Sequence, residues 1–165
     1  MITVEVDNKR ALAALNRLIR AGANPSPVLK SIGEDLIAST KRRIAAGGPG
    51  PNGETWEPNS PVTMALAARF KRPKERGNHP LVDSGILKET IDHMVDGKTL
   101  YVGTDRFADE WNGGAAVFQF GTDRAGRGHK VTIPARPFLG ISDSDARNIE
   151  TTVKNFLSSL AGKNP

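Results

Sequence analysis

The chain has 165 residues, a net charge of +5 and no cysteine. This length predicts a single domain over residues 1–165, with a core that needs neither a disulfide nor a structural metal. The lack of cysteine excludes a thiolate zinc site and a cysteine nucleophile, and it suits a protein made in a reducing cytoplasm. No stretch approaches the roughly 20 apolar residues of a membrane span, and the start of the chain is acidic. We therefore expect no signal peptide and no membrane partner.

The start of the chain predicts a strand followed by a helix. Residues 2–6 alternate β-branched and polar side chains, which is typical of a strand. Asp7 or Asn8 can then cap a helix that ends at Gly22, because a short side-chain acceptor satisfies a free backbone N–H in the first turn. The apolar face of this helix is predicted to consist of Leu12, Leu15, Leu18 and Ile19.

A second, longer helix is expected to begin at Ser26-Pro27 and to end at Gly47. Serine is a good cap, and the missing N–H of proline costs nothing in the first turn. Its predicted apolar stripe is Leu29, Ile32, Leu36, Ile37 and Ile44. Cations in the last turns offset the negative end of the helix dipole. These cations are Lys41, Arg42 and Arg43.

Residues 47–80 are predicted to be a long flexible loop that leaves the core of the domain. The Gly/Pro-rich run 47–53 cannot form regular structure, although Ser60-Pro61 can start a short helix that carries Phe70. Loops of this length in small domains are usually functional or disordered, and we expect this one to be mobile in the free subunit. A basic run follows the short helix, namely Lys71, Arg72, Lys74 and Arg76.

The second half predicts a hairpin and two further helices. Asp96-Gly97 is a strong hairpin signal between strands expected at 89–95 and 98–103. Further along, we expect a single helical turn capped by Asp83 or Ser84, a helix over 108–120, a polar loop over 121–128, a strand over 130–133 and a last helix capped by Ser142 or Asp143. The predicted fold class is α+β, with a small antiparallel sheet, including the β-hairpin, packed against amphipathic helices.

No set of residues indicates catalysis, a cofactor or a metal. His79, His93 and His129 are far apart in the sequence, and none has a second ligand at metal-binding spacing on a helix. His79 and His129 are expected to be solvated loop residues, and His93 to lie at the surface or edge of the hairpin. Ser84-Gly85 lacks the preceding glycine of a nucleophile elbow. We therefore expect that the protein is not an enzyme.

Nucleic-acid binding is the alternative that the basic charge leaves open. Cationic loops can neutralise phosphates without reading sequence. No helix-turn-helix, RNP pair or zinc finger is present, and Tyr101 is the only tyrosine, so no row of stacking aromatics is expected. The predicted contacts to DNA are Lys71, Lys74, Arg76, Arg124 and Arg127, and they would be non-specific.

Five segments, in order along the chain, resemble those of a known family. They are the Pro/Gly-rich stretch ending in Trp at 51–56, the Ser-Gly segment at 81–87, the Val-Gly strand end at 101–104, the Gln-Phe-Gly turn at 117–121 and the Pro-Ala-Arg-Pro-Phe signature within 133–140. In this respect the chain is similar to the phage virion morphogenesis family, the tail-completion proteins of Mu-like and P2-like contractile-tailed phages. The last segment is the most specific of the five.

The resemblance implies a structural role in the virion, at the tail or neck, after assembly in the cytoplasm of a bacterial host. It implies a tail-completion or head–tail joining subunit that binds copies of itself in a ring, with a hexamer expected. The expected partners are tail tube or sheath proteins and neck-connector proteins, with DNA contact as the alternative.

The same segments suggest which residues contact a partner. Pro134 and Pro137 fix the backbone on both sides of Arg136, which favours an arginine held outward for directional contacts. Alternatively, Arg136 pairs with a carboxylate of its own domain. Trp56 is either an anchor for a partner or a lid on its own domain. The predicted interface residues are Trp56, Phe70, Arg72, Gln119, Arg136 and Phe138.

Overall fold

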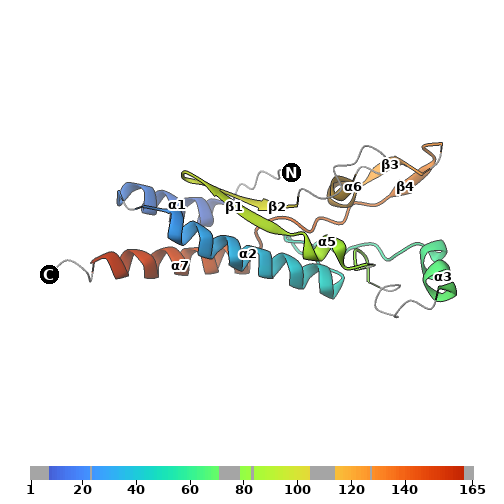
Figure 1. Cartoon of the computed structure of the whole chain (residues 1–165), viewed down its shortest axis with the longest axis horizontal. Helices are drawn as coiled ribbons and strands as arrows, with labels where there is room; N and C mark the ends of the chain where they lie inside the picture. The colour runs from blue at the N-terminus through green and yellow to red at the C-terminus, as the bar shows by residue number, and fades with distance from the viewer. Residues whose placement is uncertain are drawn as a thin grey trace.

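The structure, a computed structural model, has an α+β architecture, which confirms the predicted fold class (Figure 1). In the part that it describes, six helices accompany two antiparallel sheets of two strands each. None of the described helices has both the length and the apolarity to span a bilayer. The strand predicted at 2–6 and the basic run after Phe70 lie outside the described residues. The described residues are 8–22, 24–70, 79–82, 84–104, 114–126 and 128–161.

Three helices form one half of the molecule (Figure 1). They are α1 (Lys9–Arg20), α2 (Ser26–Ala46) and α7 (Asp143–Ala161). α7 packs against both α1 and α2. The core between them is aliphatic, and its buried members are Ala11, Ala14, Leu18, Val28, Ile32, Leu36, Ile149 and Val153. α2 and α7 are the two longest helices, with 21 and 19 residues. Most of their stability comes from the apolar face that they share.

The predicted apolar face of α1 is wrong in part. Leu18 is buried as expected, but Leu12 and Ile19 are 45% and 44% exposed. The helix instead turns Ala11 and Ala14 inward, and each is only 3% exposed. Alanines at this spacing share one helical face and let α7 approach closely, which a face of leucines would prevent.

The helix ends follow the capping rules closely. Asn8 caps α1, because its Oδ1 accepts hydrogen bonds from the N–H groups of Arg10 and Ala11 at 3.2 and 3.1 Å. Gly47 ends α2 with a φ of 74°, a left-handed conformation that glycine adopts without strain. At α7, Ser142 Oγ accepts from Asp145 N–H at 3.2 Å and Asp145 Oδ2 accepts from Ser142 N–H at 2.9 Å. This reciprocal pair is a capping box.

The hairpin lies against α2. Its strands are β1 (Asp92–Asp96) and β2 (Thr99–Gly103), and a short helix, α5 (Ile86–Glu89), precedes it. Asp96 pairs with Thr99, so the turn residues are Gly97 and Lys98 and not Asp96-Gly97 as predicted. Only the first turn residue has a positive φ, 57° at Gly97, as in a type II′ turn. The turn therefore lies one residue later than the prediction.

The other half of the molecule holds the remaining elements, far from α1 and the C-terminal end of α7 (Figure 1). They are α3 (Pro61–Arg69), α6 (Gly114–Phe120), β3 (Thr122–Ala125) and β4 (Val131–Ile133). α3 begins after Ser60 as predicted, since Ser60 Oγ accepts from Thr63 N–H. β3 pairs with β4 where a loop was expected. No side chain of β3 is fully buried, so the strand has no hydrophobic alternation by which it could be predicted.

His93 lies in β1, an edge strand of the two-stranded sheet, as one of the two predicted positions requires, but its side chain packs on Gly33 of α2 and is only 19% exposed. A Cβ added to Gly33 would lie 2.6 Å from His93 Cγ.

We expect Gly33→Ala to destabilise the protein by about 1–2 kcal/mol in a denaturant melt, because overpacking outweighs the gain in helix propensity. In a His93→Ala background the same change should instead stabilise by up to about 1 kcal/mol. Destabilisation of equal size in both backgrounds would contradict the contact.

Candidate functional site

The segment 134–140 is irregular, and side chains from several elements hydrogen-bond to its backbone. Phe138 is completely buried and Leu139 is 4% exposed. The segment belongs to no strand of either sheet, and besides the bond from Arg136 N–H to Phe118 O at 2.7 Å, side chains provide hydrogen bonds for its buried backbone. These side chains come from α2, α6 and the stretch 54–58, and they bring together four of the residues that the sequence singled out.

Gln119 of α6 holds the centre of this segment. Its Oε1 accepts hydrogen bonds from the N–H groups of Phe138 and Leu139, both at 3.0 Å, and its Nε2 donates to Leu139 O at 3.1 Å. The amide thus offers an acceptor and a donor side by side, as a neighbouring strand would. Gln119 is 5% exposed, so its role in this structure is inside its own domain.

Two further side chains complete the support. Trp56 is 5% exposed, and its Nε1 donates to Pro137 O at 3.1 Å. Arg43 donates from Nη1 to Phe138 O at 2.6 Å and from Nη2 to Asp145 Oδ2 at 3.3 Å. Burial lowers the pKa of Arg43, against the opposing effect of Asp145. The sequence predicted Arg43 only as a cation that offsets the dipole at a helix end, so its buried pair with Asp145 was missed.

Arg136 points into the domain, which corrects the prediction that it is held outward. It is 6% exposed, with Nε donating to Glu57 O at 2.9 Å and Nη2 to Pro58 O at 3.0 Å. Burial lowers the pKa of Arg136. Its hydrogen-bond partners are backbone carbonyls and not the side-chain carboxylate of the alternative prediction. The two prolines therefore fix the backbone beside Arg136, and its side chain links this segment to the backbone of residues 57–58.

The described part of residues 47–80 divides into two regions. Gly50, Pro51 and Trp56 are buried, so this first region belongs to the core and Trp56 is a lid on its own domain. In contrast, α3 has no buried residue. Three of its apolar side chains are spaced by four residues and share one face. They are Val62, Leu66 and Phe70, with exposed fractions of 68%, 47% and 65%.

The remaining predicted contacts are scattered. Arg124 lies in β3, and its side chain is 81% exposed beside Asp123. The other basic residues lie outside the described part of the chain, namely Lys71, Arg72, Lys74, Arg76 and Arg127. His79 and His129 each lie beside a backbone carbonyl, and the described residues hold no group that could bind a metal ion.

Sequence reasoning also missed two depressions in the helical half. One is an apolar groove of about 320 Å³ between α1, α2 and β2. Its walls include Leu12, Leu15, Ile32, Leu100 and Val102. The other is a cleft of about 490 Å³ between α1 and α7, lined by charged side chains. Neither depends on a sequence motif, because each forms only where separate elements meet.

Comparison with known proteins agrees with this arrangement of motifs. The model of the phage virion morphogenesis family matches residues 6–158. The chain belongs to this family. It is also 30% identical over 161 residues to Mu-like prophage FluMu G protein 2 of Haemophilus influenzae, covering 97% of this chain and 99% of that protein. No solved structure gives a significant match.

Membership confirms the resemblance seen in the five segments and gives the protein a structural role in phage virion assembly. Two of those segments now have physical explanations. The signature at 133–140 contains the buried Arg136 and the backbone that is hydrogen-bonded by Gln119, Trp56 and Arg43. The turn at 117–121 contributes Gln119, and it ends at Gly121, where an added Cβ would lie 2.8 Å from Ala135 N. The backbone approach at this point requires glycine.

The amide of Gln119 can be tested against its neighbour. We expect Gln119→Ala to lower the free energy of unfolding by about 2–5 kcal/mol, because two buried N–H groups and one carbonyl lose their partners. Phe120→Ala is the matched control, since Phe120 follows directly and is 61% exposed. It should cost less than about 1 kcal/mol in the same denaturant titration. Similar losses for both variants would contradict the proposed support of 138–139.

Glu54 gives the fold a dependence on pH. Burial acts to raise its pKa, but hydrogen bonds from its own segment, including those from Asn52 N and Nδ2 at 2.9 Å, hold the pKa below its ordinary 4.5. Its stabilising contribution is therefore complete above pH 4.5 and is lost as the pH falls through the lower, folded value.

We expect Glu54→Gln to lose less stability than the wild type between about pH 6 and about pH 3, measured as the shift in denaturant midpoint. Glu34→Gln serves as the control for the change of carboxylate to amide, because Glu34 is exposed on α2. A wild-type pH dependence in Glu54→Gln would show that this carboxylate does not contribute.

Proposed function

We propose that the protein is a tail-completion or neck subunit that forms a hexameric ring at the head-proximal end of a phage tail. Family membership supports a role in virion assembly, and the Mu-like prophage origin of the relative supports a tailed phage of that type. Such a subunit binds further copies of itself and the tail or connector proteins on either side. The observation that carries the self-association is the unpartnered helix α3.

α3 has the properties of a contact element. A helix of nine residues is marginal in water on its own, and here no described residue of the chain buries it. Its exposed face carries Val62, Leu66 and Phe70, and each such side chain gains about 1.5–3 kcal/mol when it is buried. A neighbouring protein that covers this face would therefore stabilise both the helix and the assembly.

The position of α3 suits a ring. It lies at one end of the molecule, whereas the apolar groove between α1, α2 and β2 lies in the other half (Figure 1). A contact between two different patches on successive subunits is heterologous, and it closes into a ring when the rotation between subunits permits. We propose that α3 of one subunit contacts the helical half of the next.

The first test is the mass in solution by light scattering across protein concentration. We expect a species of about six times the 17.7 kDa chain mass at micromolar concentration. Because α3 carries the contact, Leu66→Ser with Phe70→Ser should raise the concentration of half-assembly by roughly a hundredfold or more.

Met94→Ser is the control for this variant, because Met94 is 51% exposed on β1 and lines neither the groove nor α3. It should assemble as the wild type does. A wild-type mass that remains that of one chain at all concentrations would contradict self-association in solution. A ring that forms equally well with the α3 variant would place the contact elsewhere.

A further inference from the structure

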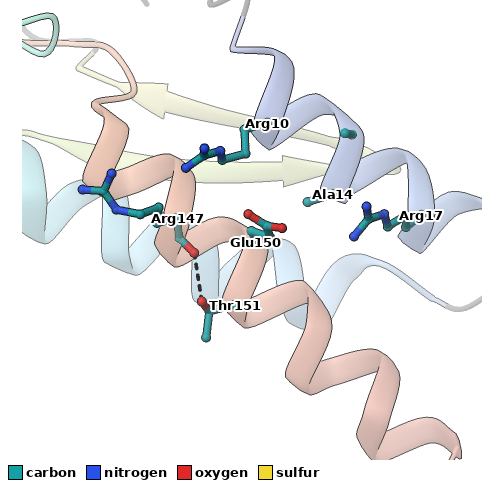
Figure 2. Close-up of a pocket in the computed structure, with 7 residues that line it drawn as sticks. Arg10, Ala14, Arg17, Arg147, Glu150 and Thr151 are labelled. Carbon is teal, nitrogen blue, oxygen red and sulfur yellow. Dashed lines mark hydrogen bonds between the residues drawn. The ribbon is translucent and has the colours of Figure 1, made fainter.

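The cleft between α1 and α7 is a separate feature from α3 and has a different chemistry. Small side chains, Ala13 and Ala14, form its α1 wall and leave space for a charged rim. Figure 2 shows Arg10 and Arg17 extending from α1 toward α7, with the carboxylate of Glu150 between them. Arg147 of α7 also lines the cleft, and its guanidinium extends away from Glu150.

The arginines of this rim have no anionic partner in the part of the chain that the structure describes. No ion pair and no hydrogen bond joins the guanidinium group of Arg10, Arg17 or Arg147 to a described residue, although Glu150 lies among them. Three cations and one carboxylate give the cleft an excess of positive charge. Guanidinium groups in this state are available for bidentate bonds to carboxylates or phosphates.

The shape of the cleft favours a peptide over a DNA duplex. The cleft is a depression along the line where α1 and α7 pack on each other, and the axes of packed helices lie only about 8–10 Å apart, so the full width of a duplex cannot enter it. The carboxylate of Glu150 also repels phosphates, whereas it can accept hydrogen bonds from the N–H groups or cations of a peptide. Arg10 and Arg17 are two helical turns apart, about 10.5 Å, a spacing that side chains of one short segment can match.

We propose that the α1–α7 cleft is a docking site for an acidic peptide segment of another virion protein, held by Arg10, Arg17 and Arg147. The chain itself carries a net charge of +5, so charge complementarity favours a different, acidic protein over a second copy. This inference goes beyond the proposed ring, because the cleft lies away from α3 and shares no lining residue with the apolar groove in the same half (Figure 1). Each can therefore fail without the other.

The test measures binding of a fluorescein-labelled oligoglutamate peptide to the full chain by anisotropy, at low and at moderate salt. We expect saturable binding that weakens with salt, because exposed ion pairs are screened. Arg10→Glu with Arg147→Glu should weaken it about tenfold or more. The control is Lys88→Glu with Lys130→Glu, which changes the net charge equally in α5 and beside β4, in the other half of the molecule (Figure 1). This control should change binding by less than about twofold.

Glu150→Gln guards against a loss that merely reflects poor folding. Removing the carboxylate from the cleft should tighten peptide binding a few-fold, which an unfolded variant cannot do. The paired arginine variant should also keep the light-scattering mass of the wild type, which separates this site from the ring contact.

Three results would overturn the proposal. The first is the absence of saturable peptide binding below about 1 mM, which would make the rim an ordinary solvated surface. The second is equal weakening by the control variant, which would indicate attraction by net charge alone. The third is tighter binding of a duplex oligonucleotide that depends on the same arginines, which would make the ligand a nucleic acid.

Discussion

A buried backbone that belongs to no sheet must find its hydrogen bonds elsewhere, and in residues 134–140 they come mainly from side chains. Gln119 supplies an acceptor for two N–H groups and a donor for the Leu139 carbonyl, while Trp56 and Arg43 donate to the two preceding carbonyls, those of Pro137 and Phe138. Pro134 and Pro137 reduce the demand, since neither has an N–H. Because an unpaired buried donor costs about 1–3 kcal/mol, each of these side chains is constrained by the others. The family signature is thus one part of a hydrogen-bond network that also includes side chains of α2, α6 and the stretch 54–58.

This network also joins the two hydrophobic clusters of the domain. One cluster lies between α1, α2 and α7, and the other surrounds Phe138 at the far end of α2. Arg43 and Asp145 form a buried ion pair where they meet, and Asp145 at the same time closes the capping box of α7. A buried pair gives little net stability after the cost of desolvation, but loss of either partner leaves an uncompensated charge. We therefore interpret the pair as fixing how α7 docks on α2, more than as a source of stability.

The elements that the sequence predicts well are those with a local cause. Asn8 and Ser142 cap their helices through contacts within three residues, and the turn at Gly97 was missed by only one position. Predictions failed where a distant segment decides the outcome. Arg136 was expected to point outward because of its flanking prolines, but carbonyls about 80 residues earlier in the chain draw it inward. Likewise, the polar strand β3 exists only because β4 pairs with it, and its own sequence contains no sign of that pairing.

Because the signature residues point inward, surfaces that contact other proteins have to lie on other parts of the chain. A subunit that joins a ring and also meets different proteins needs surfaces of different chemistry, because one patch cannot select two kinds of partner. The described molecule offers such a division, with an exposed apolar helix at one end and a cationic cleft in the other half. The network around 134–140 holds Trp56 and the chain that leads into α3 against the core. The signature residues therefore act within the domain, while the exposed side chains of α3 and of the α1–α7 cleft are accessible to other proteins.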